Sequence, residues 1–202
     1  GISNNDKIII YDHSDVISSC RCWYNFIYFG HDPNLVSVLN GGLKKWKVEG
    51  RPITNNKTKI LKSNYKSLEN KNLVKDINQI NQNIKQKKFD LIDARSKERF
   101  EGKVPDPRKN VRSGSIPNSL CLPYKEIINE DNTFKNKDVL SKKFIEIIND
   151  KDNNIVFSCG SGVTACVLAL AYSLVNNTYS PTIYDGSWAE YGKILKWRDQ
   201  QK

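Results

Sequence analysis

The sequence has no methionine and no long hydrophobic run, and only two of its 202 residues are histidine. No apolar stretch approaches the roughly 18 residues of a membrane-spanning helix, so we expect no span and no membrane partner. Residue 1 is a glycine rather than a methionine, so we expect the natural chain to begin upstream, where any targeting peptide would lie. The sequence also lacks the cysteine spacing of a metal site and the glycine fingerprint of a nucleotide-binding loop.

The five cysteines are an odd number at irregular spacing, which argues against a secreted disulfide framework. They favour a reducing intracellular compartment, either the cytoplasm or the mitochondrion. Cys20 and Cys22 point to different faces of an expected helix and make poor joint metal ligands. We interpret Cys121 and Cys166 as packing residues.

The formal net charge is +10, which by itself is compatible with binding to nucleic acid or to anionic lipid. Lysines and asparagines are spread through the whole chain, however, and no arginine-rich helix or stripe of aromatic and basic residues stands out. We therefore interpret the charge as a solvated surface and expect no nucleic-acid partner.

Two segments, residues 7–46 and 154–191, share one order of elements. Each contains a short β-rich run, a loop, an apolar stretch, a second β-rich run, a glycine turn and an aromatic-bearing helix. The apolar stretches are hydrophobic nearly all round, which predicts buried helices. The alternation predicts an α/β fold in which a parallel sheet carries helices on both faces. We infer two copies of one unit, offset by about 145 residues.

Further elements precede the second copy, with helices expected at 72–85 and 138–149 and strands at 89–94 and 115–122. Residues 65–202 thus form a complete domain, which we expect to fold alone.

The polar, aperiodic residues 51–64 indicate a linker. Residues 1–50 match only the closing part of the unit, with two strands and two apolar helices, so roughly 85 residues that would complete this first domain are expected upstream. We therefore expect apolar side chains of this part to lack their cover, namely Ile8, Ile10, Phe26, Val36 and Val38.

The segment 155–165 carries the strongest chemical signal. A buried strand ends at Cys159, and a loop with Gly160 and Gly162 leads directly into an apolar helix. The glycines allow consecutive backbone N–H groups to form an anion-binding nest around the sulfur, and the helix N-terminus adds partial positive charge. Both features stabilise a thiolate. Because ligands of open α/β sheets bind at the carboxyl ends of strands, we predict a nucleophile rather than a packed cysteine.

Two chemistries use a cysteine on such a loop. A cysteine-dependent phosphatase needs an arginine at the position that Ala165 occupies here, so a phosphatase is disfavoured. The residues favour sulfur transfer, in which the thiolate accepts a sulfur atom and stores it as a persulfide.

The loop 159–165, together with residues 93–95, 99–102, 107–108, 114–117 and 184–188, resembles the 3-mercaptopyruvate sulfurtransferases of the rhodanese superfamily. The resemblance implies a rhodanese-like catalytic domain at 65–202 and the C-terminal part of a noncatalytic rhodanese domain at 1–50. It implies transfer of sulfur from 3-mercaptopyruvate to Cys159 with release of pyruvate. The stored sulfur would then pass to a thiol acceptor such as thioredoxin, or to cyanide, with no cofactor and no metal.

The resemblance also assigns roles around the nucleophile. Arg99 and Arg108 match the positions that hold the mercaptopyruvate carboxylate, and a guanidinium suits this role because its planar fork meets a carboxylate with two charge-assisted bonds. Ser161 matches a hydroxyl that polarises the substrate. The other loop residues would surround the transferred sulfur: Gly160, Gly162, Val163 and Thr164.

Two alternatives stay open. The loop has no cations where thiosulfate-using relatives look to carry them, which favours mercaptopyruvate and leaves thiosulfate as the second donor. A noncatalytic or redox-sensing module that presents Cys159 to partners is a different class of function.

The chain also departs from the family pattern. Ser115 stands where the family usually has a histidine, and the Asp and His that complete a relay with Ser161 would lie upstream. The first copy has Asp12 at the position of Cys159. A carboxylate cannot form a persulfide, so we expect a single active site.

Overall fold

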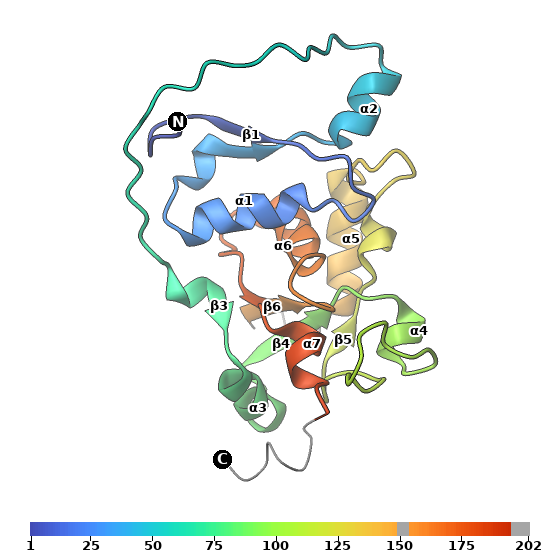
Figure 1. Ribbon diagram of the computed structural model, residues 1–202. Helices are drawn as coiled ribbons and strands as arrows, with labels where there is room; N and C mark the ends of the chain where they lie inside the picture. Colours follow the sequence, from blue (N-terminus) through green and yellow to red (C-terminus); the bar gives the residue numbers. More distant parts are fainter. Residues whose placement is uncertain (149–153, 195–202) are drawn as a thin grey trace.

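The computed structural model describes residues 1–148 and 154–194, and its centre is a parallel sheet of five strands (Figure 1). The strand order is β3-β7-β6-β4-β5, and every pairing is parallel. The predicted α/β class with a parallel sheet is confirmed. The strands are β3 (Val74–Lys75), β4 (Phe89–Asp93), β5 (Leu120–Cys121), β6 (Asn154–Ser158) and β7 (Ile183–Tyr184).

Both faces of this sheet are covered by helices. Side chains along a strand point alternately to opposite faces, so each central strand contributes apolar residues to both packed layers. Leu91 and Val156 pack with α3 and α7, whereas Ile92 and Phe157 pack with α5 and α6. These helices are α3 (Ile77–Gln86), α5 (Lys137–Ile147), α6 (Ala165–Ser173) and α7 (Ser187–Tyr191). Shorter elements are α4 (Lys97–Phe100) and the 3₁₀ turn η3 (Tyr124–Ile127), with a further 3₁₀ turn, η1 (Pro33–Leu35), before the second strand of the N-terminal unit.

Helix α6 is apolar on every side and is buried, as its sequence predicts. Cys166, Val167, Leu168 and Ala169 have no solvent exposure. One side of the helix packs on the sheet and another packs on α1 (Ser19–Tyr28), which lies between α6 and the N-terminal strands in Figure 1. The N-terminus of α6 is thereby fixed beside the end of β6.

The helix expected at 72–85 begins only at Ile77. Asp76 caps it: its carboxylate accepts a hydrogen bond from the Gln79 N–H at 2.8 Å, and the Gln79 side chain accepts one from the Asp76 N–H at 3.0 Å. This capping box fixes the start of the helix. The residues before it form the 3₁₀ turn η2 (Lys71–Leu73) and β3, which pairs with β7.

The N-terminal unit consists of a second, two-stranded parallel sheet with one helix packed on it. β1 (Ile8–Ile10) pairs with β2 (Val36–Val38), and α1 contacts both strands. Ile8 and Ile10 are partly buried, whereas Ile9 between them is 61% exposed. Within the described residues, this sheet is therefore covered on one face only.

The expectation that apolar residues of this unit lack cover is wrong for the residues named. Val36 is 4% exposed, and the others are partly buried against the same core that contains α6: Ile8, Ile10, Phe26 and Val38. For the strand residues the cover comes from α1 and from the core behind it, whereas Phe26, which is part of α1, packs edge-on against His31 and Tyr65.

The second predicted apolar helix of this unit, α2 (Gly42–Val48), is not buried. No residue of the helix is buried, and Val48 is 84% exposed. Lys44, Lys45 and Lys47 separate its apolar residues, so these residues form no continuous apolar face. The prediction of two apolar helices is wrong here.

The segment between α2 and η2 contains no helix or strand and runs along the outside of the molecule (Figure 1). Its last part packs on the N-terminal unit: the Leu68 N–H donates to the Phe29 carbonyl at 3.0 Å, and the Asn70 N–H donates to that of Tyr28 at 2.8 Å. The Tyr65 ring stacks on the buried His31, with centroids 5.8 Å apart. The domain limits at residues 50 and 65 stay predictions.

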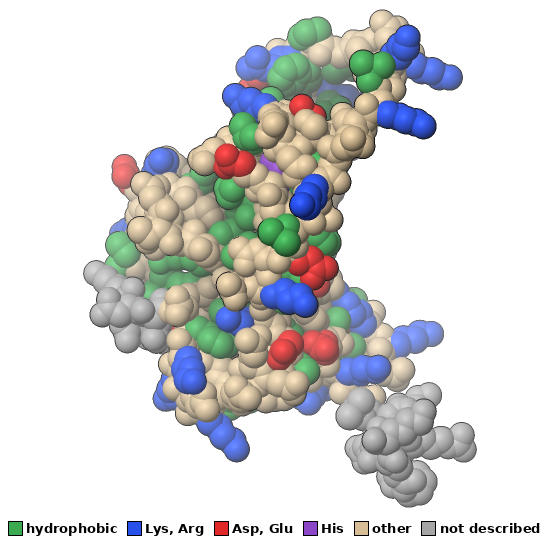
Figure 2. Space-filling model, turned by 90° about the vertical axis from the view of Figure 1, so that its left-hand side faces the viewer, with side chains coloured by type: hydrophobic (Ala, Val, Ile, Leu, Met, Phe, Trp, Pro, Cys, Tyr) green, Lys and Arg blue, Asp and Glu red, His purple; other side chains and the backbone are tan. Residues whose placement is uncertain are grey.

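The charged surface shows no single basic patch on the face drawn in Figure 2, where the Lys and Arg side chains lie scattered among polar groups. No helix within residues 1–148 and 154–194 is long and apolar enough to cross a membrane.

Candidate active site

Cys159 lies directly after β6, at the carboxyl-terminal edge of the five-stranded sheet, and is 2% exposed. The backbone of α7 holds the loop that begins there. The Trp188 N–H donates to the Cys159 carbonyl at 3.0 Å, and the Ala189 N–H donates to that of Gly160 at 2.9 Å. The loop is thus fixed between the strand end, α7 and the start of α6.

Ser187 organises the inside of this loop. Its Oγ accepts hydrogen bonds from the Cys159 N–H and the Gly162 N–H, both at 3.1 Å, and donates to the Tyr184 carbonyl at 2.8 Å. Ser187 is fully buried, with a φ of 51° in the left-handed region. Two amides of the expected nest therefore bind this hydroxyl.

Other amides of the loop have no acceptor among the residues that the structure describes. They are the N–H groups of Gly160, Ser161, Val163 and Thr164. They lie between Cys159 and the N-terminus of α6, where the helix dipole adds partial positive charge. These groups are suited to stabilise a negative charge on a sulfur attached to Cys159.

Arg99 and Arg108 converge on the same loop. Arg99 is on α4 and Arg108 is in the segment that follows it. A Cβ atom at Gly160 would lie 3.1 Å from both Nη atoms of Arg108 and 3.4 Å from Nη2 of Arg99. Both guanidiniums therefore lie against the backbone next to Cys159, and their side chains are 27% and 35% exposed.

Asp106 joins the two arginines. Its carboxylate is 1% exposed; Oδ2 accepts from Arg99 Nη2 at 2.7 Å, and Oδ1 accepts from the Arg108 N–H at 3.0 Å and from Arg108 Nη1 at 3.2 Å. Burial raises the pKa of Asp106, but the hydrogen bonds from Arg99 and Arg108 outweigh it and hold this pKa below its ordinary value.

The N-terminal unit contacts the Cys159 loop at Gly162. Arg21 of α1 donates from Nη1 to the Gly162 carbonyl at 3.4 Å and forms an ion pair with Asp185, which follows β7. Gly162 has a φ of +78°, and a Cβ atom there would lie 2.6 Å from Asp185 Oδ1 and 2.7 Å from Arg21 Nη1. The left-handed φ favours glycine here, and a larger residue would also have to displace the ends of the Asp185 and Arg21 side chains.

Ser161 is exposed beside Cys159, and its hydroxyl forms no hydrogen bond with the described residues. Val163 and Thr164 are half-buried between it and α6. The structure thus brings the sequence-predicted residues of the loop and both arginines to one place. The roles assigned to them stay predictions.

Three residues at this place had no role in the sequence-based prediction: Ser187, Asp106 and Arg21. Ser187 lies within the motif 184–188 that carried part of the resemblance, and Asp106 lies between two prolines in the segment that joins the arginines. Those two contexts were the available signals. Arg21 lies far from the loop in the sequence, and no local pattern marks it.

The other cysteines differ from Cys159 in their surroundings. Burial and the nearby Asp93 raise the pKa of Cys121 to about 12. Burial also raises the pKa of Cys20 and of Cys166, whose Sγ donates to the Gly162 carbonyl at 3.2 Å. Cys166 packs in the core as predicted. No group of three or more His, Cys, Asp or Glu side chains within the described residues is placed to bind a metal ion.

Asp12, expected from the sequence at the position equivalent to Cys159, binds groups at the start of α1. Its carboxylate accepts hydrogen bonds from the hydroxyls of Ser14 and Ser18 at 2.7 Å and from the Ser19 N–H at 3.0 Å. It stabilises the start of the helix.

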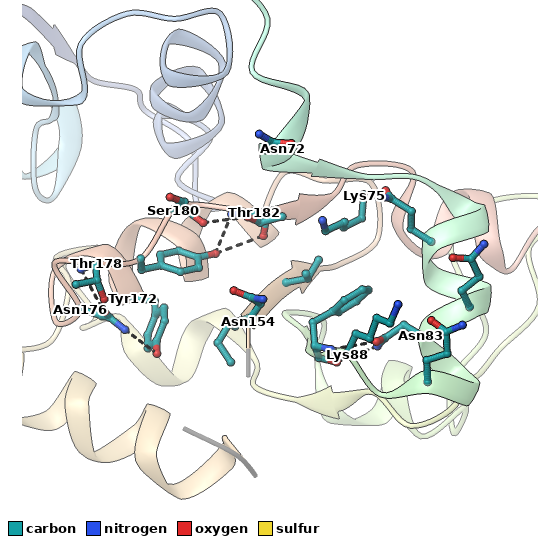
Figure 3. Close-up of a pocket in the computed structure, with 17 residues that line it drawn as sticks. Asn72, Lys75, Asn83, Lys88, Asn154, Tyr172, Asn176, Thr178, Ser180 and Thr182 are labelled. Atoms are coloured by element: carbon teal, nitrogen blue, oxygen red, sulfur yellow. Dashed lines mark hydrogen bonds between the residues drawn. The ribbon is translucent and has the colours of Figure 1, made fainter. Parts of the chain in front are cut away.

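A cavity of about 650 Å³ lies at the opposite, amino-terminal edge of the sheet (Figure 3). Some of its polar side chains bind to neighbouring protein groups: Asn176 donates to Tyr172 at 3.0 Å, and the Tyr179 hydroxyl accepts from the Thr182 N–H at 2.9 Å. Asn154, the first residue of β6, lines the cavity, whereas Cys159 follows the last residue of the same strand, which rises roughly 3.3 Å per residue. It is therefore not part of the candidate active site.

Comparison with known proteins gives the family. The model of the rhodanese-like domain matches residues 1–49 and 76–193. The chain belongs to the rhodanese family. The rhodanese-like fold expected from the loop 159–165 and its companion motifs is confirmed, and the match extends to the N-terminal unit.

Curated relatives have names that refer to one or both of two sulfur donors, thiosulfate and 3-mercaptopyruvate. A thiosulfate/3-mercaptopyruvate sulfurtransferase of Arabidopsis thaliana, named mitochondrial, is 35% identical and is matched over 95% of this chain and 55% of its own length. Rat thiosulfate sulfurtransferase (35% identical) and human 3-mercaptopyruvate sulfurtransferase (32%) are each matched over 95% of this chain and 64% of their own length. The chain thus spans between about half and two thirds of these relatives.

Solved structures also agree with this fold. Tum1 from Saccharomyces cerevisiae has a TM-score of 0.82 at 29% identity, over 95% of this chain and 67% of its own. SseA from Escherichia coli, a 3-mercaptopyruvate sulfotransferase, has a TM-score of 0.78 at 29% identity, over 93% of this chain and 69% of its own.

Proposed function

We propose that this rhodanese transfers sulfur from 3-mercaptopyruvate to Cys159 and from there to an acceptor. The observation that carries the proposal is the meeting of two guanidiniums with the Cys159 loop at Gly160. A carboxylate held by Arg99 and Arg108 would place the rest of a small donor over the nucleophile.

In the first half-reaction, the Cys159 thiolate attacks the sulfur atom of the donor. An S–S bond forms as the donor C–S bond breaks, and the electron pair of that bond leaves on the pyruvate fragment as an enolate. The enolate takes up a proton and leaves as pyruvate. The Ser161 hydroxyl, exposed beside the nucleophile, polarises the donor.

The product of this step is a persulfide whose outer sulfur carries negative charge. Its stabilisation is assigned to the N-terminus of α6 and to four N–H groups that have no acceptor within residues 1–148 and 154–194, those of Gly160, Ser161, Val163 and Thr164. Gly162 contributes through its backbone turn rather than through its N–H, which donates to Ser187.

In the second half-reaction, an acceptor thiolate attacks the outer sulfur and restores the Cys159 thiolate. A protein thiol of the thioredoxin kind, or cyanide, is the proposed acceptor. The proposed compartment is the cytoplasm or the mitochondrion, and the Arabidopsis relative named mitochondrial supports the second.

Thiosulfate is the second candidate donor. Relatives with very similar identities have names for thiosulfate, for 3-mercaptopyruvate or for both. A pair of partly exposed guanidiniums attracts either anion, so donor preference requires the direct comparison described below.

The test of the nucleophile is mass spectrometry of the chain after treatment with 3-mercaptopyruvate. We expect one added sulfur on the peptide that contains Cys159, and we expect Cys159→Ser to abolish both this addition and pyruvate release. Cys121→Ser is the matched control and should retain both, because that thiol stays protonated at neutral pH. Added sulfur on Cys121 or Cys166, or none anywhere, contradicts the proposal.

A further inference from the structure

Asp106 places a buried negative charge between the two arginines that face the Cys159 loop. Its carboxylate is 1% exposed, and both of its oxygens accept hydrogen bonds from Arg99 or Arg108. The three side chains together carry one net positive charge. We propose that Asp106 sets donor specificity by limiting the arginine pair to this single net charge.

The geometry makes Asp106 a positioning residue as well. Arg99 is bound through Nη2 at 2.7 Å, and Arg108 is bound through both its backbone N–H and its Nη1. These bonds hold both guanidiniums at Gly160 rather than in solvent. Asp106 satisfies only part of the Arg99 fork, because Arg99 Nε has no acceptor among the described residues.

The charge argument separates the two candidate donors. Mercaptopyruvate presents one carboxylate, which matches one net positive charge. Thiosulfate carries two negative charges, and its second charge meets the field of the Asp106 carboxylate at close range. The penalty acts on the dianion more than on the monoanion, because Coulomb energy scales with the product of the charges.

Neutralising Asp106 should therefore move donor preference toward thiosulfate. We take the Asp106 charge and the second negative charge of thiosulfate to be about 5 Å apart, with an effective dielectric constant between those of water and of a protein surface. Removing the Asp106 charge then changes the affinity for the dianion, relative to the monoanion, by about tenfold. Looser arginines should lower turnover of both donors to a similar extent. A change in the ratio of the two kcat/KM values therefore measures the effect of the Asp106 charge. A decrease that is common to both kcat/KM values measures the effect of Asp106 on the position of the arginines.

The experiment measures kcat and KM for both donors in the chain and in three variants. In Asp106→Asn, the ratio of kcat/KM for thiosulfate to that for mercaptopyruvate should rise about tenfold. In Asp106→Glu, which keeps the charge but shifts the arginines, both values should fall with the ratio within about twofold of the original. Glu101→Gln, the matched control, removes a carboxylate of the same segment that pairs with Lys103 at the surface and should change neither value.

Thermal unfolding of each variant shows whether it is folded at the assay temperature. If Asp106→Asn is not folded, Asp106→Ser is the second neutral variant and should show the same shift in ratio. An unchanged ratio in a folded neutral variant overturns the proposal, and so does an equal shift in Asp106→Glu.

The inference rests on the proposed sulfurtransferase function, and the two fail differently. If the unmodified chain puts sulfur on Cys159 from either donor while neutral variants keep its donor ratio, only the role of Asp106 is wrong. If the unmodified chain takes sulfur from neither donor, the proposed function fails and the inference fails with it.

Discussion

Removing the Ser187 hydroxyl should destabilise the protein and distort the Cys159 loop together. The hydroxyl makes three hydrogen bonds, accepting from the Cys159 and Gly162 N–H groups and donating to the Tyr184 carbonyl. The side chain has no solvent exposure, so water does not readily replace it. Ser187→Ala leaves these backbone groups without that partner while changing the side-chain volume little.

The magnitude follows from these groups. A buried polar group without a partner costs about 1–3 kcal/mol, and partial relaxation reduces the sum. We expect Ser187→Ala to lower the free energy of unfolding by about 2–4 kcal/mol. Ser187→Gly loses the same bonds but relieves the φ of 51°, so it should be about 1 kcal/mol more stable than the alanine variant.

The assay is urea unfolding, followed by circular dichroism, with Ser180→Ala as the matched control, since Ser180 is an exposed serine just before β7. The control should stay within about 0.5 kcal/mol of the original chain. The rate of sulfur uptake on Cys159, measured in urea-free buffer, should fall in both Ser187 variants. A Ser187→Ala variant as stable as the control, or a glycine variant less stable than the alanine one, would refute this account.

Further predictions concern the charged groups at the site. Arg108→Ala should lower kcat/KM for mercaptopyruvate by roughly 30- to 150-fold, and Arg108→Lys should recover little of it because lysine lacks the planar fork; steady-state pyruvate release measures both. Arg21→Ala should lower the free energy of unfolding by only about 0.5 kcal/mol, since the ion pair of Arg21 with Asp185 is partly exposed. It should nevertheless slow sulfur uptake on Cys159 more than a surface substitution such as Arg51→Ala does. Folding lowers the pKa of Asp106, so the ionised side chain stabilises the folded protein above the unfolded pKa of about 3.9, and this stabilisation is lost as the pH falls through the folded pKa. Asp106→Asn should therefore reduce the pH dependence of the free energy of unfolding below about pH 4 and leave that between pH 5 and 8 unchanged.

The part of the site that was predictable from the sequence is the part encoded locally. A buried strand, Cys159, the loop glycines and an apolar helix are consecutive in the chain, so their pattern predicts both the structure and the thiolate chemistry. Arg99 and Arg108 were found through the resemblance, and the structure places them at Gly160.

Residues that act through tertiary placement escaped prediction. Ser187 binds the loop only because β7 ends beside β6 in the sheet, an order that the sequence does not state. Asp106 is a charged residue in an irregular segment, where exposure is the usual expectation, and it is buried because two arginines enclose it. The local context marks both residues, one inside a motif and one between two prolines, but it does not show which groups they contact.

Errors in the predicted fold have similar causes. The helical pattern from residue 72 continues the spacing of α3 backwards, but Asp76 caps the helix and the residues before it pair with β7. In α2 the aromatic and aliphatic residues indicate a buried helix, but Lys44, Lys45 and Lys47 lie between them and leave the helix exposed.

The N-terminal unit contributes to the site in two ways, which bear on the prediction that residues 65–202 fold alone. Trp23, Tyr24 and Ile27 of α1 share one core with α6, so a chain without α1 would expose an apolar side of a helix that has no polar face. The same helix carries Arg21, which bonds the Gly162 carbonyl. Because α6 supplies the N-terminus beside Cys159, loss of its packing partner would loosen the amides that we propose to stabilise the persulfide. The N-terminal unit has Asp12 rather than a cysteine before α1, but this helix packs on the helix that follows the proposed nucleophile Cys159.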